Sequence, residues 1–510
     1  MSDSWTSGYV ADIGYTYGYY TELNPVRIKP AFAYHAIESP TIGFACELGF
    51  GQGLSTNLHA NASNCEWWGT DFNPSQTAFA IELARHGKKN IRLFDEAFED
   101  FCYQKDLPQF DFIGLHGIWS WISDENRKVI VDFIRRKLNV GGVLYVSYNT
   151  LPGWAAFAPM RHLMTEHSEI LGSEGRGIVS RIDGALEFAE QLLATNPIFS
   201  RANPLVGERL SKMKSQNKHY LAHEYFNRDW HPMHFASMAK WLEPAKVQYA
   251  CSANYIDSID TVNLTQEQQV FLRDIPDDMF RQTVRDFMVN QQFRKDYWIK
   301  GKRSMNPLAH GELLRSIRVV LGTPREDVAL KVMGSLGEAN LNEDVYLPLL
   351  DLLADHKPRT LADVSAQLKN LSFAQLLQAS MVLTGAGHLH PAQDEESNQT
   401  AKKATAAINK AILSRARANG DIQYLSSPVT GGGIVVSRFQ QLFLLAKQNG
   451  RKTPDEWAKF AWDLLAAQGQ RILIEGKTLE TAEENLAELA RQAKVFKDKQ
   501  LSVFSALGIE

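Results

Sequence analysis

The sequence predicts an α/β fold in which a parallel sheet, covered by helices, occupies the first third of the chain. Short apolar runs alternate there with amphipathic helical patterns, and this alternation is typical of such a sheet. A glycine-rich turn follows the first apolar run, at residues 49–53. At 510 residues the chain is too long for one hydrophobic core, so we expect several domains.

Seven extended segments are predicted for the sheet, and helices fall between them, for instance over 76–86 and 124–138. The first five strands are expected at 43–48, 66–69, 91–94, 110–115 and 142–147. Two later runs, 247–256 and 297–300, read as a hairpin-like pair that completes the sheet. A helix is expected to start at Pro232, since proline suits a first helical turn.

The remaining residues divide the chain into three predicted domains: 1–301, 302–393 and 394–510. The first contains a helical insertion at about 157–226. In the second, three short helices (347–354, 361–368, 373–382) precede a strand-like 388–390, which resembles a winged helix. The third is predicted to begin with a polar linker at Asp394 and to be mostly helical, with a first helix over 404–418.

Composition favours a folded enzyme. Hydrophobic residues make up 44%, and 54 Lys and Arg nearly balance 58 Asp and Glu, so neither a nucleic-acid track nor a membrane surface is indicated. The 4 cysteines show no C-x-x-C spacing, which favours a reducing compartment. Because no secretory signal or apolar span of about 18 residues is visible, we expect a cytoplasmic protein without membrane insertion.

The glycine-rich turn carries the first chemical signal. Glu47-Leu48-Gly49-Phe50-Gly51-Gln52-Gly53 follows a strand and precedes a helix, and its glycines let the backbone approach a ligand closely. A dinucleotide site requires G-x-G-x-x-G, but Leu54 stands at the last glycine position. A P-loop is excluded because no Gly-Lys-Ser/Thr follows. Asp71 closes the second strand, where a carboxylate can accept hydrogen bonds from two ribose hydroxyls.

This E-x-G-x-G-x-G pattern with a following acidic residue resembles class I S-adenosylmethionine-dependent methyltransferases, whose sheet is Rossmann-like. The resemblance implies that S-adenosyl-L-methionine is the cofactor and that the third strand end holds the adenine, through either Asp95 or Glu96. The implied cofactor-binding residues are Glu47, Gly49, Gly51, Gly53, Asp71, Phe72, Asn73, Asp95, Glu96, Ala97, Phe98, His116 and Gly117.

Two longer strings are similar to bacterial methyltransferases that carry a methyltransferase regulatory domain. They are H-G-x-W-S-W at 116–121 and V-S-Y-N-T-x-P-G-W at 146–154. That group includes the rickettsial-type outer-membrane-protein lysine methyltransferases. The resemblance covers about residues 8–300 and implies a protein lysine as acceptor, in an outer-membrane or surface-protein precursor. Helical insertions and winged helices often mediate pairing, so a homodimer is one expectation.

An amine acceptor must lose its proton before it accepts a methyl group, and aromatic faces attract both the sulfonium and the methylated ammonium. Aromatic residues at strand ends or in the N-terminal segment are therefore candidates, and His116 is a candidate proton relay. We assign catalytic roles to Trp119, Tyr148, His116, Tyr15 and Tyr17. We assign the substrate side to Trp121, Asn149, Trp154, His223 and Glu224.

Other functions fit less well. Nucleic-acid methylation lacks an N-P-P-Y-like string after the fourth strand, where Leu115-His116-Gly117 stands instead. No metal is expected, because His219, His223, His231 and His234 form no H-E-x-x-H and have no cysteine partner. A scaffold with a vestigial site would have lost Asp71 or the glycines. A methyltransferase for a small molecule or glycan remains the alternative.

Overall fold

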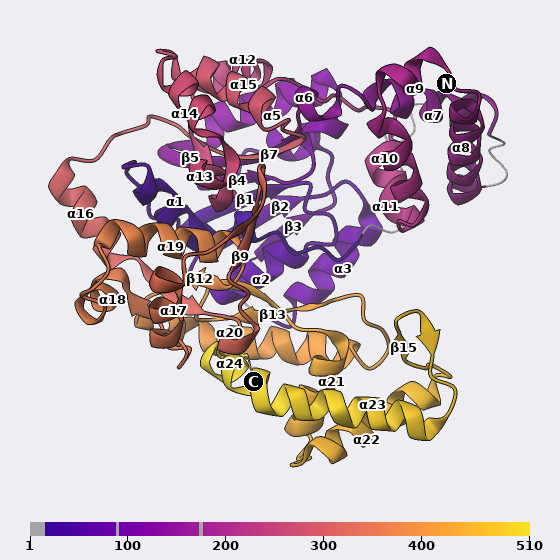
Figure 1. The fold of residues 1–510 in the computed structure, drawn as a ribbon, viewed down its shortest axis with the longest axis vertical. Helices are drawn as coiled ribbons and strands as arrows, with labels where there is room; N and C mark the ends of the chain where they lie inside the picture. Colours follow the sequence, from indigo (N-terminus) through magenta and orange to yellow (C-terminus); the bar gives the residue numbers. More distant parts are fainter. Residues whose placement is uncertain (1–15, 88–90, 173–176, 510) are drawn as a thin grey trace.

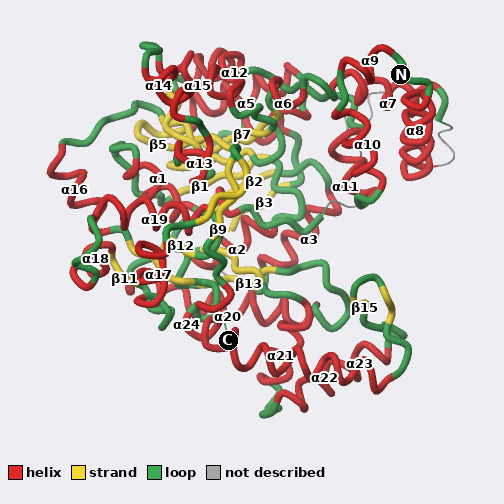
Figure 2. The backbone as a smooth tube through the Cα atoms, viewed as in Figure 1, coloured by secondary structure: helices red, strands yellow, loops and turns green. Residues whose placement is uncertain are grey.

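A seven-stranded sheet stands at the centre of the computed structural model, which describes residues 16–87, 91–172 and 177–509 (Figure 1). The strand order is β3-β2-β1-β4-β5-β7-β6. The strands are β1 (Phe44–Leu48), β2 (Glu66–Thr70), β3 (Ile91–Phe94), β4 (Phe110–Leu115), β5 (Leu138–Asn149), β6 (Gln248–Ser252) and β7 (Phe293–Ile299). The predicted α/β fold is confirmed, and helices surround the strands on both sides (Figure 2).

Strands β1 to β5 are parallel, whereas β7 runs antiparallel between β5 and β6. The late pair therefore completes the sheet, as predicted. Strand β5 is longer at both ends than its apolar run indicates, because it pairs with β4 on one side and with β7 on the other. Its last residue, Asn149, lies opposite Phe293, the first residue of β7.

Two of the helices that flank the sheet lie within two residues of the predicted ranges 76–86 and 124–138. The flanking helices are α1 (Ile28–Tyr34), α2 (Leu54–Ala62), α3 (Pro74–Ala84), α4 (Phe98–Cys102), α5 (Asp124–Lys137), α6 (Leu151–Trp154), α12 (Phe235–Leu242), α13 (Asp260–Asn263), α14 (Gln266–Arg273) and α15 (Asp278–Met288). The expectation that a helix starts at Pro232 was wrong. Met233 forms a bridge with Thr150 instead, so α12 begins only at Phe235.

The insertion is helical and has its own apolar core, which includes Met164, Ile182 and Leu210. It projects to one side of the sheet (Figure 1). Its helices are α7 (Ala158–Ile170), α8 (Gly177–Ala194), α9 (Ile198–Ala202), α10 (Leu205–Lys214) and α11 (Lys218–Tyr225).

The middle part shares a continuous core with one face of the sheet, since Phe112 and Tyr297 belong to the same buried cluster as Leu349 and Leu376. Three helices and a strand lie where the winged helix was expected; the winged-helix assignment itself, like the domain boundaries, stays a prediction. The elements are α16 (Pro307–Ser316), β8 (Arg318–Leu321), β9 (Lys331–Gly334), β10 (Gly337–Asn340), α17 (Glu343–Leu352), β11 (Arg359–Thr360), α18 (Leu361–Gln367), α19 (Phe373–Gly385) and β12 (Leu389–Pro391).

The last part packs against α2 and α3, because Leu58 and Leu83 join its apolar core. No linker follows Asp394: the Asp394 side chain caps α20, which begins at Glu395. The elements are α20 (Glu395–Arg415), β13 (Tyr424–Ser427), β14 (Gly432–Val435), α21 (Arg438–Gln448), α22 (Pro454–Ala467), β15 (Leu473–Ile474), β16 (Lys477–Thr478), α23 (Ala482–Val495) and α24 (Leu501–Ala506). Within the described ranges, no helix is long and apolar enough to cross a bilayer.

Candidate active site

The glycine turn leaves β1 through three residues with positive φ: Gly49 at 73°, Gly51 at 58° and Gly53 at 64°. A side chain is disfavoured at Gly49 by its positive φ, and a Cβ atom there would lie 2.3 Å from Ile118 Cδ1, so the Ile118 side chain would have to move. A side chain is also disfavoured at Gly53, where a Cβ atom would lie 2.6 Å from the Ala80 Cβ of α3. The turn therefore brings α2 close to α3 and leaves its own backbone accessible.

The turn and the carboxylate after β2 lie side by side. Strands β1 and β2 are parallel and in register, with Leu48 opposite Thr70, so both chains leave the sheet at the same edge. The Gly51 N–H donates to Asp71 Oδ2 at 2.8 Å, and the Asn73 N–H donates to Asp71 Oδ1 at 3.0 Å. Burial raises the pKa of Asp71 to about 6, although these two backbone donors oppose the increase. Each carboxylate oxygen keeps a lone pair for a further donor.

A cavity of about 530 Å³ opens over this pair, outside the carboxyl ends of β1, β2 and β4. Ligands bind at this edge in open α/β sheets, and the volume lies within the usual range for small-molecule sites, about 300–1,000 Å³. Ten predicted residues line it: Gly49, Gly51, Asp71, Phe72, Glu96, Ala97, Phe98, His116, Gly117 and Trp121.

The structure distinguishes Asp95 from Glu96 by their positions relative to the cavity. Glu96 lines the cavity, whereas Asp95 does not. The Glu96 carboxylate accepts from Gln104 Nε2 at 2.6 Å, and its backbone carbonyl accepts from Thr70 Oγ1 at 2.5 Å. Glu96 is thereby held beside the end of β2, next to Asp71.

Three further residues of the predicted cofactor set support the cavity from behind. Glu47 is buried beneath the turn and is linked to the Thr56 hydroxyl of α2. Burial raises the pKa of Glu47 to about 8, so its carboxyl group is mostly protonated at neutral pH. Asn73 caps α3 by accepting from Ser75 N at 3.0 Å, and Gly53 provides the α2–α3 contact. They shape the turn and do not line the cavity.

His116 lies on the cavity wall in an apolar environment. Its ring stacks on Tyr20 at 3.6 Å between centroids, and its Nδ1 lies 2.8 Å from Tyr145 Oη. Burial lowers the pKa of His116 to about 3, so the imidazole is neutral at pH 7 and is a weak base. His116 lines the cavity next to the glycine turn, but this basicity does not suit a proton relay.

Trp121 lines the cavity and is 8% exposed. Its indole Nε1 is buried and has no hydrogen-bond partner among the described residues. The surface that it offers to a ligand is therefore ring surface, which suits an apolar or cationic group. Trp121 therefore fits the ligand-contacting role predicted for it.

The other strand-end aromatic residues lie away from the cavity. Trp119 has no exposed surface: its indole N–H points to Met233 Sδ at 3.4 Å, and its carbonyl accepts from Arg127. Tyr148 donates to Asp296 Oδ2 at 2.9 Å, on the far side of β5. The Asn149 N–H donates to Ser120 Oγ at 2.8 Å. Because they are fully engaged in packing, Trp119 and Tyr148 do not suit the catalytic roles predicted for them.

The remaining substrate candidates are Trp154, at the end of α6 just before the insertion, and His223 and Glu224 within the insertion. Trp154 packs in the core of the insertion with Arg209 at 3.8 Å from its ring centroid. His223 and Glu224 lie on α11, where burial raises the pKa of Glu224 to about 7. None of the three lines the cavity.

Part of the N-terminal segment lies against the cavity. Thr16, Gly18 and Tyr20 line it, and the Tyr20 N–H donates to Ser55 Oγ on α2 at 2.8 Å. Tyr17 itself turns away and packs edge-on against Phe79 at 4.8 Å. Tyr15 lies outside the described residues.

Several residues that line the cavity were not predicted from the sequence. Gln76 lies in the first turn of α3, directly after the Asp71 loop, and sequence proximity was a usable signal for it. Ser123 and Asn126 form the N-terminal cap of α5, and their closeness in sequence to Trp121 was a comparable signal. Arg228 and Asp229 come from the loop after the insertion, which is placed by a 2.7 Å bond from the His231 N–H to the Ser120 carbonyl. No local pattern predicts that placement.

Comparison with known proteins gives a family model and several relatives. Residues 217–300 match the family model described as a predicted methyltransferase regulatory domain. The chain is 42% identical to the Synechocystis protein sll1526 over 99% of this chain and 100% of that one. It is 23% identical to Rickettsia prowazekii RP789 over 64% of this chain and 59% of that protein.

Solved structures share the fold along nearly the whole chain. The structure of PKMT2 from Rickettsia typhi in complex with AdoHcy superposes with a TM-score of 0.70 at 17% identity, over 96% of this chain and 99% of that one. A second structure of PKMT2 gives a TM-score of 0.65 at 16% identity, over 94% and 98% of the two chains. At such identities the likeness concerns the fold.

Proposed function

We propose a function from one premise: the chain belongs to the protein family of Synechocystis sll1526, and its residues 217–300 form a methyltransferase regulatory domain. The proposed activity is transfer of a methyl group from S-adenosyl-L-methionine to the side-chain nitrogen of lysine in a protein. The observation that carries the proposal is the 2.8 Å bond between the Gly51 N–H and Asp71, at the base of a cavity of about 530 Å³.

The residues present suit such a donor. Asp71 offers the two acceptors that a ribose diol needs, and Glu96, Ala97 and Phe98 provide a carboxylate, a backbone amide and an apolar ring for adenine. A Cβ atom at Gly49 would occupy part of this cradle. When bound, the donor supplies an electrophilic methyl group on a sulfonium.

The chain's own contribution is alignment and exclusion of water, because methyl transfer from a sulfonium needs no nucleophilic side chain. Tyr20, Trp121 and Phe98 present aromatic faces that suit a sulfonium and an alkylated amine. An apolar slot also lowers the pKa of a lysine acceptor and favours the neutral amine. Asp229 lines the cavity, and we assign its negative charge to orient the acceptor amine, whose proton is lost to solvent before the transfer.

The finer parts of the proposal rest on the resemblance to outer-membrane-protein lysine methyltransferases for the substrate, on the cysteine spacing for the compartment, and on the helical insertion and winged-helix-like part for the oligomeric state. They are a protein substrate of the surface-protein type, a reaction in the cytoplasm and a homodimeric enzyme. The glycan or small-molecule alternative is separated from them by the experiment below.

The test uses purified full-length protein, donor labelled in its methyl group, and lysate of the source cell separated into protein, nucleic-acid and small-molecule fractions. Label is expected in the protein fraction, and acid hydrolysis is expected to release it as methylated lysine. Gly49→Ala is the inactive comparison and Gly141→Ala the matched control: both positions have positive φ, but a Cβ at Gly141 meets nothing within 4 Å. Label confined to small molecules would exclude the lysine proposal.

A further inference from the structure

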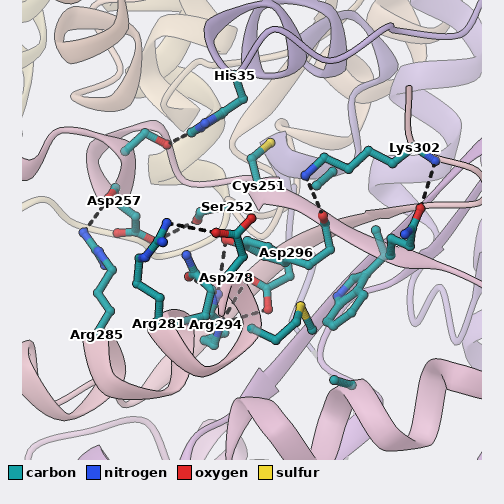
Figure 3. A pocket seen from close by; sticks show the side chains of 18 of the residues that line it. His35, Cys251, Ser252, Asp257, Asp278, Arg281, Arg285, Arg294, Asp296 and Lys302 are labelled. Carbon is teal, nitrogen blue, oxygen red and sulfur yellow. Dashed lines mark hydrogen bonds and ion pairs between the residues drawn. The ribbon is translucent and has the colours of Figure 1, made fainter. Parts of the chain in front are cut away.

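A second and larger cavity, of about 1100 Å³, lies at the opposite end of the sheet, against the edge strand β6. Most of its wall comes from α12, β6, α14, α15 and β7, all within the segment that matches the regulatory domain. Figure 3 shows Arg294 and Asp296 at its centre, Arg281 and Arg285 on one side and Lys302 on the other. The proposed methyl transfer uses none of these groups.

The floor of this cavity is an ion cluster in which Arg294 is fully paired. Arg294 donates from Nη1 to Asp286 at 2.5 Å and from Nε to Asp296 at 2.8 Å, and its Nη2 reaches Tyr249 Oη at 3.2 Å. These side chains are nearly fully buried. The floor is therefore rigid and offers little further binding capacity.

Above the floor, cations are in surplus. Besides Arg294 and Asp296 of the floor, six Lys or Arg residues and four carboxylates line the cavity, and one of these carboxylates, Glu243, forms no ion pair with a described residue. Asp257 accepts from Ser252 at 2.8 Å, and Asp278 and Asp260 face Arg281 and Arg285. In contrast, four lining cations form no ion pair with any described residue: Lys240, Lys246, Arg273 and Lys302. Positive charge without a protein partner favours an anionic ligand.

An extended peptide added to the edge of β6 is the competing occupant, and the strand argues against it. Ala250 and Cys251 are 5% and 2% exposed, so the middle of the edge is already covered. The Lys302 ammonium occupies the Tyr249 carbonyl at 3.2 Å. A chain pairing along β6 would have to displace both.

We propose that this cavity binds a small molecule carrying two or more anionic groups, phosphate or carboxylate. Its volume is too large for a single inorganic anion and suits a ligand of nucleotide or tricarboxylate size. The unpaired cations hold the charged groups, while Leu272 and Met279 provide apolar wall. This inference does not depend on the methyl-transfer proposal, because binding is measured without donor or acceptor.

The test is calorimetric titration of the full-length protein with pyrophosphate and, separately, with citrate, at constant ionic strength. Saturable binding of at least one is expected, and the one that binds identifies the anionic group. Arg273→Gln with Lys302→Gln is expected to weaken that binding about tenfold, because charge-assisted hydrogen bonds are lost. Both residues are exposed, so folding is retained.

The matched control is Arg451→Gln with Lys452→Gln, an exposed pair in the C-terminal part that removes the same total charge. Its affinity is expected to equal that of the unmodified protein. The proposal is overturned if neither anion gives a saturable titration. It is also overturned if the cavity variant binds as tightly as the control, since the binding would then reflect net charge alone.

Discussion

Replacing Asp71 by asparagine tests whether the Asp71 carboxylate binds the ribose of the methyl donor. One carboxylate oxygen becomes an amide NH₂, which cannot accept from the Gly51 N–H or the Asn73 N–H that now point at the two oxygens. The variant also loses the charge that strengthens hydrogen bonds from ribose hydroxyls. Each such loss in a buried site costs about 1–3 kcal/mol, so donor affinity should fall about 5- to 150-fold.

The assay is calorimetric titration with S-adenosylhomocysteine between pH 5 and pH 8. In the unmodified protein Asp71 has a pKa of about 6, so affinity should fall as the pH drops through 6 and the carboxylate becomes protonated. The Asp71→Asn variant has no such group and should lose this pH dependence.

Asp111→Asn provides the control, because the Asp111 carboxylate accepts from Gly43 N at 2.9 Å and from Phe44 N at 3.0 Å at the opposite end of β1. It repeats the loss of a backbone acceptor away from the cavity. Equal affinities for Asp71→Asn and the unmodified protein, or equal losses in the two variants, would refute the ribose assignment.

Three further predictions concern the supports of the site. Gly49→Ala should abolish donor binding, whereas Gly141→Ala should cost only stability, as read by titration and thermal unfolding. Because the pKa of Glu47 is raised from 4.5 to about 8, the folded state binds the extra proton, so the free energy of unfolding should decrease between pH 4.5 and 8; Glu47→Gln should remove that slope in denaturant titrations. Arg294→Met should cost about 3–5 kcal/mol of stability, because two buried carboxylates lose their partner, whereas the exposed Arg135→Met should cost at most about 1 kcal/mol in the same urea titration.

The sheet was predictable because each strand carries a local pattern. Apolar runs with flanking turns located all seven strands, and the glycine turn with Asp71 located the ligand-binding edge. Pairing partners were not readable from local patterns, so the true length of β5 and the start of α12 were missed. The helix after Asp394 was missed because its first turns are polar and solvent-facing.

For the candidate site too, local patterns were informative, whereas tertiary placement could not be read from the sequence. Residues beside the turn or at the end of their own strand, such as Phe72 and Gly117, line the cavity, and their role in binding stays a prediction. Side-chain direction was the failure: Trp119 and Trp121 stand two residues apart, yet one is sealed in the core and the other faces the cavity. Arg228 and Asp229 depend on how a long insertion returns to the sheet, which is a tertiary property.

Strand β7 contacts two distant parts of the molecule: the buried ion cluster and the N-terminal segment at Glu22. Its alternate side chains point in opposite directions: Arg294 and Asp296 belong to the buried ion cluster, whereas Lys295 reaches Glu22 Oε1 at 2.6 Å and Tyr297 donates to the Glu22 carbonyl at 2.6 Å. Glu22 follows Tyr20, which covers the first cavity. Deleting the segment around β7 would therefore remove the contacts that hold Tyr20 over the first cavity. A truncated protein that ends before β7 is expected to lose donor binding as well as the edge of its sheet.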